Sequence, residues 1–376
     1  MKIICKKSNL VKALGIVTKA VSPVSTLGIT KGVLIKTEGD LKISLSATDI
    51  QLAITTGVSA IVNEEGAVVV DARMFSDFIR NLPEEDVVLM TDEKNILSIR
   101  TETTDNEIQG IEESEFPRIE GAEEGKKIKV EKAALREMIE GVCFAASTDE
   151  SRGVITGVLF ELEEGNMALV ALDGYRVAIR RDYREELKEE KLTAVIPAKM
   201  LREAGKILAD AGTEEAEATL EIGENRAVLE TEDTVVRMNL LNGDYIKYKE
   251  VLPKEFSVKF VARREELLNA VELAGILKAE DGKSSFVRFS ITDDSLIVSS
   301  RSNAGRGKET VAIDKEGEDL EIGFDARFLK EALRAAGEES VVLEFGTSIS
   351  PAVMRALEGD AFTYLILPVR LSTVNI

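Results

Sequence analysis

The chain has 376 residues, of which 44% are apolar and 5% aromatic, and tryptophan is absent. This length predicts two or three domains with cores of Val, Ile, Leu and Ala. Histidine is absent and two cysteines occur, which excludes His-based acid–base catalysis, Ser-His and Cys-His nucleophiles, and ordinary zinc sites. A net charge of −20 argues, taken alone, against binding to nucleic acid.

The residues also indicate a cytoplasmic protein without a membrane segment. No apolar run reaches the roughly 18 residues that a membrane helix needs. The N-terminal sequence MKIICKKSNLVKAL lacks the layout and the small-residue cleavage site of a signal peptide. In that compartment we expect Cys5 and Cys143 to be small buried residues.

The first third of the chain predicts two amphipathic helices with strands between them. Residues 7–20 and 73–81 have apolar side chains at three- and four-residue spacing. The second helix is preceded by Asp71, which suits a helix start, and places Phe75, Phe78 and Ile79 on one face. Between the helices, GVLIKTEGDLKISLSATDIQLAI predicts strands joined by a Gly-containing turn.

The same succession occurs twice more. The segments VDARMFSDFIRNLPEEDVVLM, IPAKMLREAGKILADAG and FDARFLKEALRAAGEESVVLEF begin at residues 70, 196 and 324 and resemble one another. Further helices are predicted over 132–146, 197–210, 262–278 and 325–335. The strands of GVLFELEEGNMALVALDGYRVAI match those of the first third, and those of FVRFSITDDSLIVSS match less closely. We therefore expect three α+β domains of two helices and several antiparallel strands each, with the bounds 1–122, 123–252 and 253–376.

The charges are unevenly distributed between the predicted helices and the rest of the chain. The six helical windows contain 16 Lys and Arg against 10 Asp and Glu, although the whole chain is acidic. Two interpretations stay open. The helices present ordinary solvated faces, or they line one surface that faces phosphates while acidic sheets face away and repel DNA.

Four motifs carry a resemblance to a known family: LDGYRVAI (172–179), NGDYIKYKEVLP (242–253), EIGFDARFL (321–329) and TYLILPVRL (363–371). Together with the repeats and the basic helices, they make the chain similar to the bacterial sliding clamp, the beta subunit of DNA polymerase III, over residues 1–371. The resemblance implies three clamp domains in a head-to-tail dimeric ring, with helices lining the inside and antiparallel sheets outside. It implies no catalysis, no cofactor and no metal.

The resemblance also implies the function and the partners. A closed ring holds duplex DNA topologically and without sequence preference, so each contact can be weak. Such a processivity factor tethers the alpha subunit of the replicative DNA polymerase, the clamp loader and other proteins with a clamp-binding motif, in the cytoplasm at the nucleoid. The DNA-facing residues that the resemblance implies are Lys12, Arg73, Arg80, Arg152, Lys199, Arg202 and Lys206.

Two further sets of residues follow from the resemblance. The dimer joint pairs the first domain near Ile108 with Ile276 and Leu277 of the third. A pocket between the second and third domains binds short extended peptides on an apolar floor with a polar rim. The positions that match this pocket are Ile155, Leu172, Gly174, Tyr175, Arg176, Val177, Ile246, Val251, Asp325, Phe328, Ile349, Pro351, Leu367, Pro368, Val369, Arg370 and Leu371.

The chain departs from the family pattern in each set. Asn106 stands where a large apolar residue is frequent, so the dimer joint is expected to be more polar. In the DNA-facing set and in the pocket, residues that are frequent in the family are replaced at Val24, Gly153, Val154, Leu172, Ile246 and Glu250. Five residues, STVNI, follow Leu371.

The residues bear on two rival functions, a catalytic one and that of a scaffold. A nuclease or nucleotidyl transferase needs carboxylates that converge on metal ions, but the Asp and Glu residues here occur mostly in solvated runs. The phosphate-loop lookalike SNAGRGKE has Ser302 in place of the first Gly and Glu309 in place of Ser or Thr. The other rival, a three-repeat interaction scaffold that does not encircle DNA, is motivated by the net charge.

Overall fold

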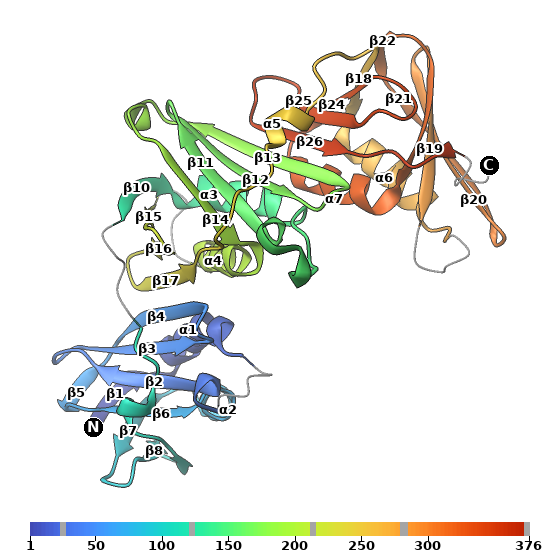
Figure 1. The fold of residues 1–376 in the computed structure, drawn as a ribbon. Coiled ribbons are helices and arrows are strands. Elements are labelled where there is room, and N and C mark those ends of the chain that lie inside the picture. The colour runs from blue at the N-terminus through green and yellow to red at the C-terminus, as the bar shows by residue number, and fades with distance from the viewer. Residues whose placement is uncertain (23–27, 120–124, 211–215, 279–284, 372–376) are drawn as a thin grey trace. The chain divides into compact units, whose positions relative to one another are not determined.

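The structure, a computed structural model, describes residues 1–22, 28–119, 125–210, 216–278 and 285–371 (Figure 1). Its contacts divide the chain into two compact units, Met1–Leu135 with Glu203–Leu240 and Arg136–Arg202 with Leu241–Ile376. The expected domain boundary at residues 122 and 123, position 24 and the segment after Leu371 lie outside the described residues. In the ranges given, no helix is long and apolar enough to cross a membrane.

The first unit contains two antiparallel sheets. The five-stranded sheet has the order β5 (Ile61–Glu64), β1 (Lys2–Lys6), β7 (Asp86–Thr91), β8 (Ile96–Arg100) and β9 (Asp105–Gln109). The eight-stranded sheet has the order β10 (Lys126–Glu131), β15 (Glu217–Ile222), β16 (Arg226–Glu230), β17 (Thr234–Asn239), β4 (Leu52–Ser59), β3 (Lys42–Thr48), β2 (Gly32–Thr37) and β6 (Ala67–Asp71).

The second unit also contains two antiparallel sheets. The nine-stranded sheet has the order β14 (Leu192–Pro197), β11 (Gly157–Glu163), β12 (Asn166–Leu172), β13 (Arg176–Tyr183), β26 (Phe362–Ile366), β25 (Ala352–Ala356), β24 (Ser340–Phe345), β18 (Val258–Arg263) and β22 (Asp314–Gly317). The four-stranded sheet has the order β21 (Gly305–Ala312), β20 (Ser295–Ser302), β19 (Phe286–Thr292) and β23 (Leu320–Asp325).

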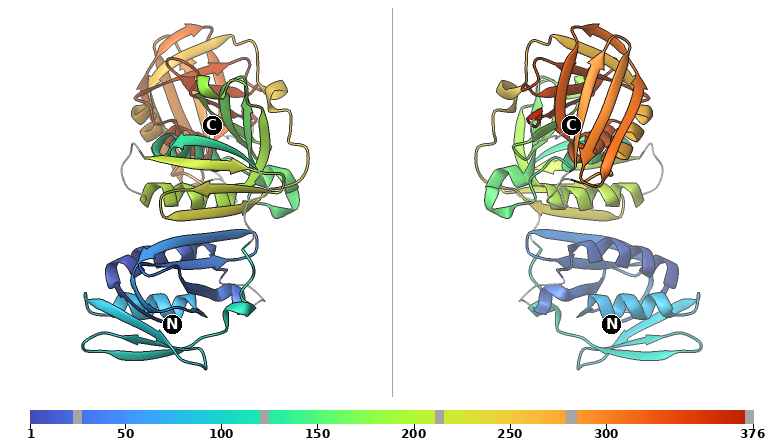
Figure 2. Two further views of the ribbon diagram at one scale, coloured as in Figure 1. Left: turned by 90° about the vertical axis from the view of Figure 1, so that its left-hand side faces the viewer. Right: turned by 90° about the vertical axis from the view of Figure 1, so that its right-hand side faces the viewer.

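All six predicted amphipathic helices are confirmed, with ends that differ by a few residues. They are α1 (Lys7–Val17), α2 (Ala72–Asn81), α3 (Lys132–Cys143), α4 (Ala198–Asp210), α6 (Arg264–Ala274) and α7 (Ala326–Ala336). Helices α1 and α2 pack side by side in the first unit, and α6 and α7 do so in the second (Figure 2). The short helix α5 (Tyr248–Val251) was not predicted, because four residues show no helical period.

Aspartate side chains begin two of these helices, as the sequence predicts. The Oδ1 atom of Asp71 accepts a hydrogen bond of 2.8 Å from the Met74 amide, and Asp325 does the same for the Arg327 amide at 2.8 Å. Each bond satisfies a main-chain donor that the first turn of a helix leaves unpaired. Gly337 ends α7 with a φ of 75°, a left-handed conformation that favours glycine.

The elements follow one another in the same order three times. Each repeat begins with a strand and a helix (β1 and α1, β10 and α3, β18 and α6) and continues with a meander of three strands (β2–β4, β11–β13, β19–β21). It closes with a strand, a helix and a second meander (β6, α2 and β7–β9; β14, α4 and β15–β17; β23, α7 and β24–β26). The predicted threefold repetition of α+β domains is therefore confirmed.

Equivalent strand pairs join consecutive repeats. In the first unit, β17 of the second repeat pairs with β4 of the first, with Met238 opposite Leu52. In the second unit, β26 of the third repeat pairs with β13 of the second, with Ile366 opposite Arg176. At both joints the last strand of one repeat extends the first meander of the repeat before it. This pairing places strands of two repeats in one continuous sheet.

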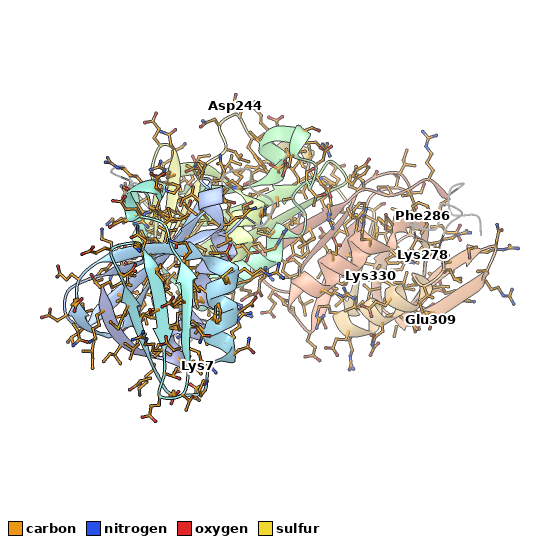
Figure 3. The ribbon with its side chains drawn as sticks, turned by 90° about the horizontal axis from the view of Figure 1, so that it is seen from below. Lys7, Asp244, Lys278, Phe286, Glu309 and Lys330 are labelled. Carbon is orange, nitrogen blue, oxygen red and sulfur yellow. The ribbon has the colours of Figure 1, made fainter. Side chains whose placement is uncertain are left out.

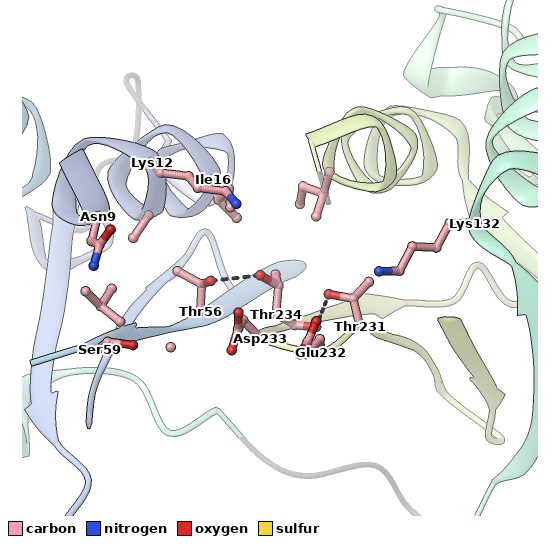
Figure 4. A pocket seen from close by; sticks show the side chains of 14 residues that line it. Asn9, Lys12, Ile16, Thr56, Ser59, Lys132, Thr231, Glu232, Asp233 and Thr234 are labelled. Carbon is pink, nitrogen blue, oxygen red and sulfur yellow. Dashed lines mark hydrogen bonds between the residues drawn. The ribbon is translucent and has the colours of Figure 1, made fainter. Parts of the chain in front are cut away.

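The joint between β4 and β17 contains a buried pair of hydroxyl groups. The Oγ1 atoms of Thr56 and Thr234 lie 2.7 Å apart (Figure 4). Their residues are 2% and 4% exposed. A buried hydroxyl that loses its partner costs more free energy than the bond itself contributes, because water cannot replace the partner.

We expect the single changes Thr56→Val and Thr234→Val each to lower the free energy of unfolding by about 1–2 kcal/mol, since each leaves one hydroxyl unpaired. The double variant should lose less than the sum, because valine keeps the shape and no hydroxyl remains. Urea unfolding followed by circular dichroism measures all three. Strictly additive losses would contradict the coupling of the two side chains across this joint.

Candidate functional sites

Every residue expected in the partner pocket belongs to the second unit. Ile155, Leu172 and Val177 lie in a buried apolar cluster, which also contains Tyr248 and Leu365. Other members of the set are large apolar residues that remain exposed: Ile349 (78%), Tyr175 (60%), Val251 (48%), Ile246 (44%) and Leu367 (38%). The set thus combines a buried apolar base with apolar side chains that water contacts, which is the composition expected of a peptide-binding surface.

Main-chain hydrogen bonds bring three of the four motifs together. The amide of Leu367 donates to the carbonyl oxygen of Tyr175 at 2.9 Å, and the amide of Val369 donates to that of Gly323 at 2.8 Å. The C-terminal segment therefore bonds both to the start of β13 and to β23. Residues far apart in the sequence, from LDGYRVAI, EIGFDARFL and TYLILPVRL, meet at this segment.

The fourth motif bonds to β11 and β12 of the same sheet through two tyrosines. The hydroxyl of Tyr245 donates to the carbonyl oxygens of Gly157 and Val170, both at 3.3 Å. The Tyr248 hydroxyl donates to Glu161 Oε2 at 2.7 Å. Burial raises the pKa of both tyrosines well above the usual value, so their hydroxyls stay protonated and keep these bonds. No local pattern in the sequence predicts these partners, because they lie far from the two tyrosines along the chain.

Arg176 is held by interior contacts. The residue is 8% exposed, and its guanidinium donates to Asp173 Oδ2 at 3.0 Å, to the Phe144 carbonyl oxygen at 2.6 Å and to the carboxylate of Glu331. Its Cζ atom lies 5.2 Å and 4.7 Å from the ring centroids of Phe144 and Phe328. These contacts fix β13 against α7 and the residue that follows α3. No local motif connects Phe144 and Glu331 to Arg176, so these two contacts were not predicted from the sequence.

The turn before β13 depends on a glycine. Gly174 has a φ of 89°, which L-residues rarely adopt, and a Cβ atom there would lie 3.0 Å from a guanidinium nitrogen of Arg152. Arg152 in turn donates to the carbonyl oxygen of Asp173. The ring of Tyr175 stacks on Phe328, with centroids 5.9 Å apart. The predicted DNA-facing residue Arg152 thus contacts the turn of the expected peptide site.

The seven expected DNA-facing cations are all exposed. Three have partners within the fold: Arg152 as above, Arg202, which donates to the Cys143 carbonyl oxygen at 2.9 Å, and Lys206, which lies 2.8 Å from Glu203. In the part of the chain that the structure describes, the other four form no ion pair or hydrogen bond. These four are Lys12 on α1, Arg73 and Arg80 on α2, and Lys199 on α4.

The three residues expected at the dimer joint differ in exposure. Ile108 on β9 is 3% exposed and lies opposite Leu97 in its own sheet, so only its main chain is available to a partner. Ile276, which follows α6, is 67% exposed. The side chain of Leu277 lies over β21, 3.9 Å from the positions that Cβ atoms would take at Gly305 and at Gly307.

Groups that could support covalent or metal chemistry are scarce. Burial raises the pKa of the Cys5 and Cys143 thiols to about 12, so neither is a thiolate near neutral pH. Among the described residues, no three or more Cys, Asp and Glu side chains converge in a way that could hold a metal ion.

Comparisons with known proteins give three consecutive matches to models of one family. They are the N-terminal, central and C-terminal domains of the DNA polymerase III beta subunit, over residues 1–120, 129–247 and 249–370. The beta sliding clamp of Staphylococcus aureus is 30% identical, over 98% of this chain and 99% of the relative.

Solved structures agree with these matches. The sliding clamp of Bacillus subtilis has a TM-score of 0.93 at 26% identity, and covers 98% of this chain and 99% of its own. The DNA polymerase III beta subunit of Thermotoga maritima has a TM-score of 0.89 at 28% identity, with the same coverage. Since the matches extend over all three repeats, the chain belongs to the DNA polymerase III beta subunit family, the beta sliding clamps, and is a non-catalytic processivity factor.

Proposed function

We propose that two copies of this chain close head to tail into a ring around duplex DNA, and that the ring tethers the replicative DNA polymerase. In this proposal residues 1–122, 123–252 and 253–376 form the three domains of each copy, and the ring works in the cytoplasm at the nucleoid. The observation that carries the proposal is the repeated joint between consecutive repeats, which β4 and β17 form once and β13 and β26 form again.

The repetition supports ring closure because the first and the third repeat each have an edge strand at the place where the other repeats form a joint. β9 is the last strand of the first repeat, as β17 and β26 are of the second and third. β21 occupies the place in the third repeat that β4 and β13 occupy in the first and second. In the described ranges, β9 and β21 each pair on one side only. A second copy supplies β21 for β9 and β9 for β21, which closes two equal joints near Ile108, Ile276 and Leu277.

Helix cations support sequence-independent sliding. Lys12, Arg73, Arg80 and Lys199 are exposed and unpaired among the described residues, and such side chains contact phosphates without reading bases. We assign Arg152, Arg202 and Lys206 to the same DNA-facing surface. Their contacts within the fold leave fewer donors free for phosphates. A closed ring needs only weak contacts, because DNA leaves when the ring opens or when an end passes through it.

The apolar surface of the second unit supports binding of a short extended peptide. We propose that it takes the clamp-binding motifs of the polymerase alpha subunit, the clamp loader and other replication and repair proteins. Apolar side chains of the peptide would cover Tyr175, Ile246, Val251, Ile349 and Leu367. Six of the other expected residues, Pro351, Asp325, Pro368, Val369, Arg370 and Leu371, would form the rim, while Arg176 holds β13 in place.

The first test compares retention on circular and linear DNA. After a clamp loader has acted, we expect the chain to stay on a nicked circular plasmid and to leave the same plasmid once it is cut. Gel filtration of loaded complexes measures retention. Equal retention on both forms, or none on either, would support a scaffold that does not encircle DNA.

A second test addresses the helix cations. Changing Lys12, Arg73 and Lys199 to Glu should slow loading on circular DNA at least tenfold, because phosphates would meet carboxylates. The matched control changes Lys42, Lys94 and Lys254 to Glu, which are exposed cations on strands and turns. Both variants carry the same net charge, so equal loading of the two would show that position on the helices does not matter.

A third test addresses the peptide surface. A fluorescent peptide with the clamp-binding motif of the cognate polymerase should bind at least tenfold more weakly to the double variant Ile246→Glu, Leu367→Glu, since two apolar contacts are lost. Leu357→Glu is the control, because Leu357 is 52% exposed and lies outside the expected set. Fluorescence anisotropy measures the Kd, and an unchanged Kd for the double variant would rule out this surface.

A further inference from the structure

The two joints within the chain share one register. Leu52 lies opposite Met238 in the first, and Arg176 lies opposite Ile366 in the second. Their meanders align as well, because ATDIQLAI and ALDGYRVAI place Leu52 and Arg176 at the same position after a shared Asp. An equivalent joint therefore has a predictable register.

The hairpins fix the residues of β9 and β21 that correspond to this register. Arg100 lies opposite Asp105 at the end of the β8–β9 hairpin, and Glu230 lies opposite Val235 at the end of the β16–β17 hairpin. Asp105 therefore corresponds to Val235, and three residues further along each strand Ile108 corresponds to Met238. Ser295 lies opposite Ala312 as Asn166 lies opposite Tyr183, so Gly305 corresponds to Arg176. A joint between β9 and the β21 of another copy then places Ile108 opposite Gly305.

This register sets opposite charges against each other. Counting along the antiparallel strands from Ile108 and Gly305, Glu107 lies opposite Arg306 and Asp105 lies opposite Lys308. All four side chains are exposed, and alternation places them on one face of the sheet. At the corresponding positions of the joints within the chain, the pairs are Ala53 with Arg237, Thr55 with Val235, Val177 with Leu365 and Ile179 with Thr363, none of which has opposite charges.

The two edges also carry charge that their own sheets do not neutralise. Arg306 lies directly opposite Arg301 in the β20–β21 pair, and both are exposed cations. Like charges in that position repel, and a carboxylate on the other side of β21 would relieve the repulsion. Among the described residues, Glu107, Arg306 and Lys308 form no ion pair, and Asp105 contacts Arg100 at 3.0 Å.

The inner face of the same register leaves room for a partner strand. Gly305 and Gly307 have no side chains, and the side chain of Leu277, which follows α6, lies 3.9 Å from the positions that their Cβ atoms would take. Figure 3 labels Lys278, which follows this segment, and Glu309 on β21. Opposite the two glycines come Ile108, which its own sheet buries, and Asn106, which is half-buried. Val236 of β17 and Tyr364 of β26, which correspond to Asn106, are each 1% exposed.

We propose that cross-strand ion pairs close the joints between two copies of this chain: Glu107 with Arg306, and Asp105 with Lys308. The proposal rests on the proposed ring and adds its register and its polarity. The charges also select the pairing, since two β9 edges would bring carboxylates together and two β21 edges would bring cations together. Salt screens exposed pairs, so the joints between copies should weaken with ionic strength while the joints within the chain persist.

The test uses charge reversal with rescue. Glu107→Lys and Arg306→Glu should each raise the dimer dissociation constant at least tenfold at 50 mM salt, because both joints of each homodimer then set like charges together. A mixture of the two variants should dimerise within about threefold of the parent chain, since one joint keeps the original pair and the other has it reversed. Lys254→Glu is the control. Sedimentation velocity at 50 and 500 mM salt measures every sample, and rescue by mixing shows that both variants fold.

The outcomes separate this proposal from the ring itself. Reversals that leave the dimer unchanged, or a mixture that stays monomeric, would overturn the ion pairs. If the chain still remains on circular DNA in that case, the ring stands with a different register. A parent chain that neither dimerises nor stays on circles would overturn both.

Discussion

Main-chain hydrogen bonding at the edges of sheets governs the organisation of this chain. An edge strand exposes a row of N–H and C=O groups that favour pairing with another strand. The repeats satisfy this demand through one another, because β17 pairs beside β4 and β26 pairs beside β13. The continuous sheets that result explain why contacts group parts of two repeats into one compact unit. β9 and β21 are also edge strands in the described chain, and the proposed ring pairs each of them with the other strand of a second copy.

The chemistry of the side chains agrees with a processivity factor that binds other molecules and catalyses no reaction. The thiols are buried and protonated near neutral pH, histidine is absent, and the buried guanidinium of Arg176 is occupied by Asp173, Glu331 and a carbonyl oxygen. The net charge of −20 does not oppose the function, because the charge is unevenly distributed. Cations concentrate on the helices, where several lack partners among the described residues, and acidic residues dominate elsewhere.

Elements of the fold that leave a short-period pattern in the sequence could be predicted well. Amphipathic spacing located the six long helices of the described residues, and the threefold recurrence of segments such as VDARMF and FDARFL located the repeats. Contacts between distant segments could not be predicted. Nothing near Arg176 in the sequence indicates that Phe144 and Glu331 surround its side chain, and nothing indicates that Leu367 bonds to Tyr175. Ile108 shows the same limit. The resemblance implied a place at the dimer joint, and no pattern near Ile108 indicated that its own sheet would bury its side chain.

Hydrogen exchange on the unmodified chain tests most directly whether β9 and β21 meet across two copies. At micromolar concentration, the amides of β9 and β21 should be protected to a similar degree, and dilution should expose both strands together while β4, β17, β13 and β26 stay protected. Exchange of β9 and β21 at the rate of open loops at every concentration would contradict the account.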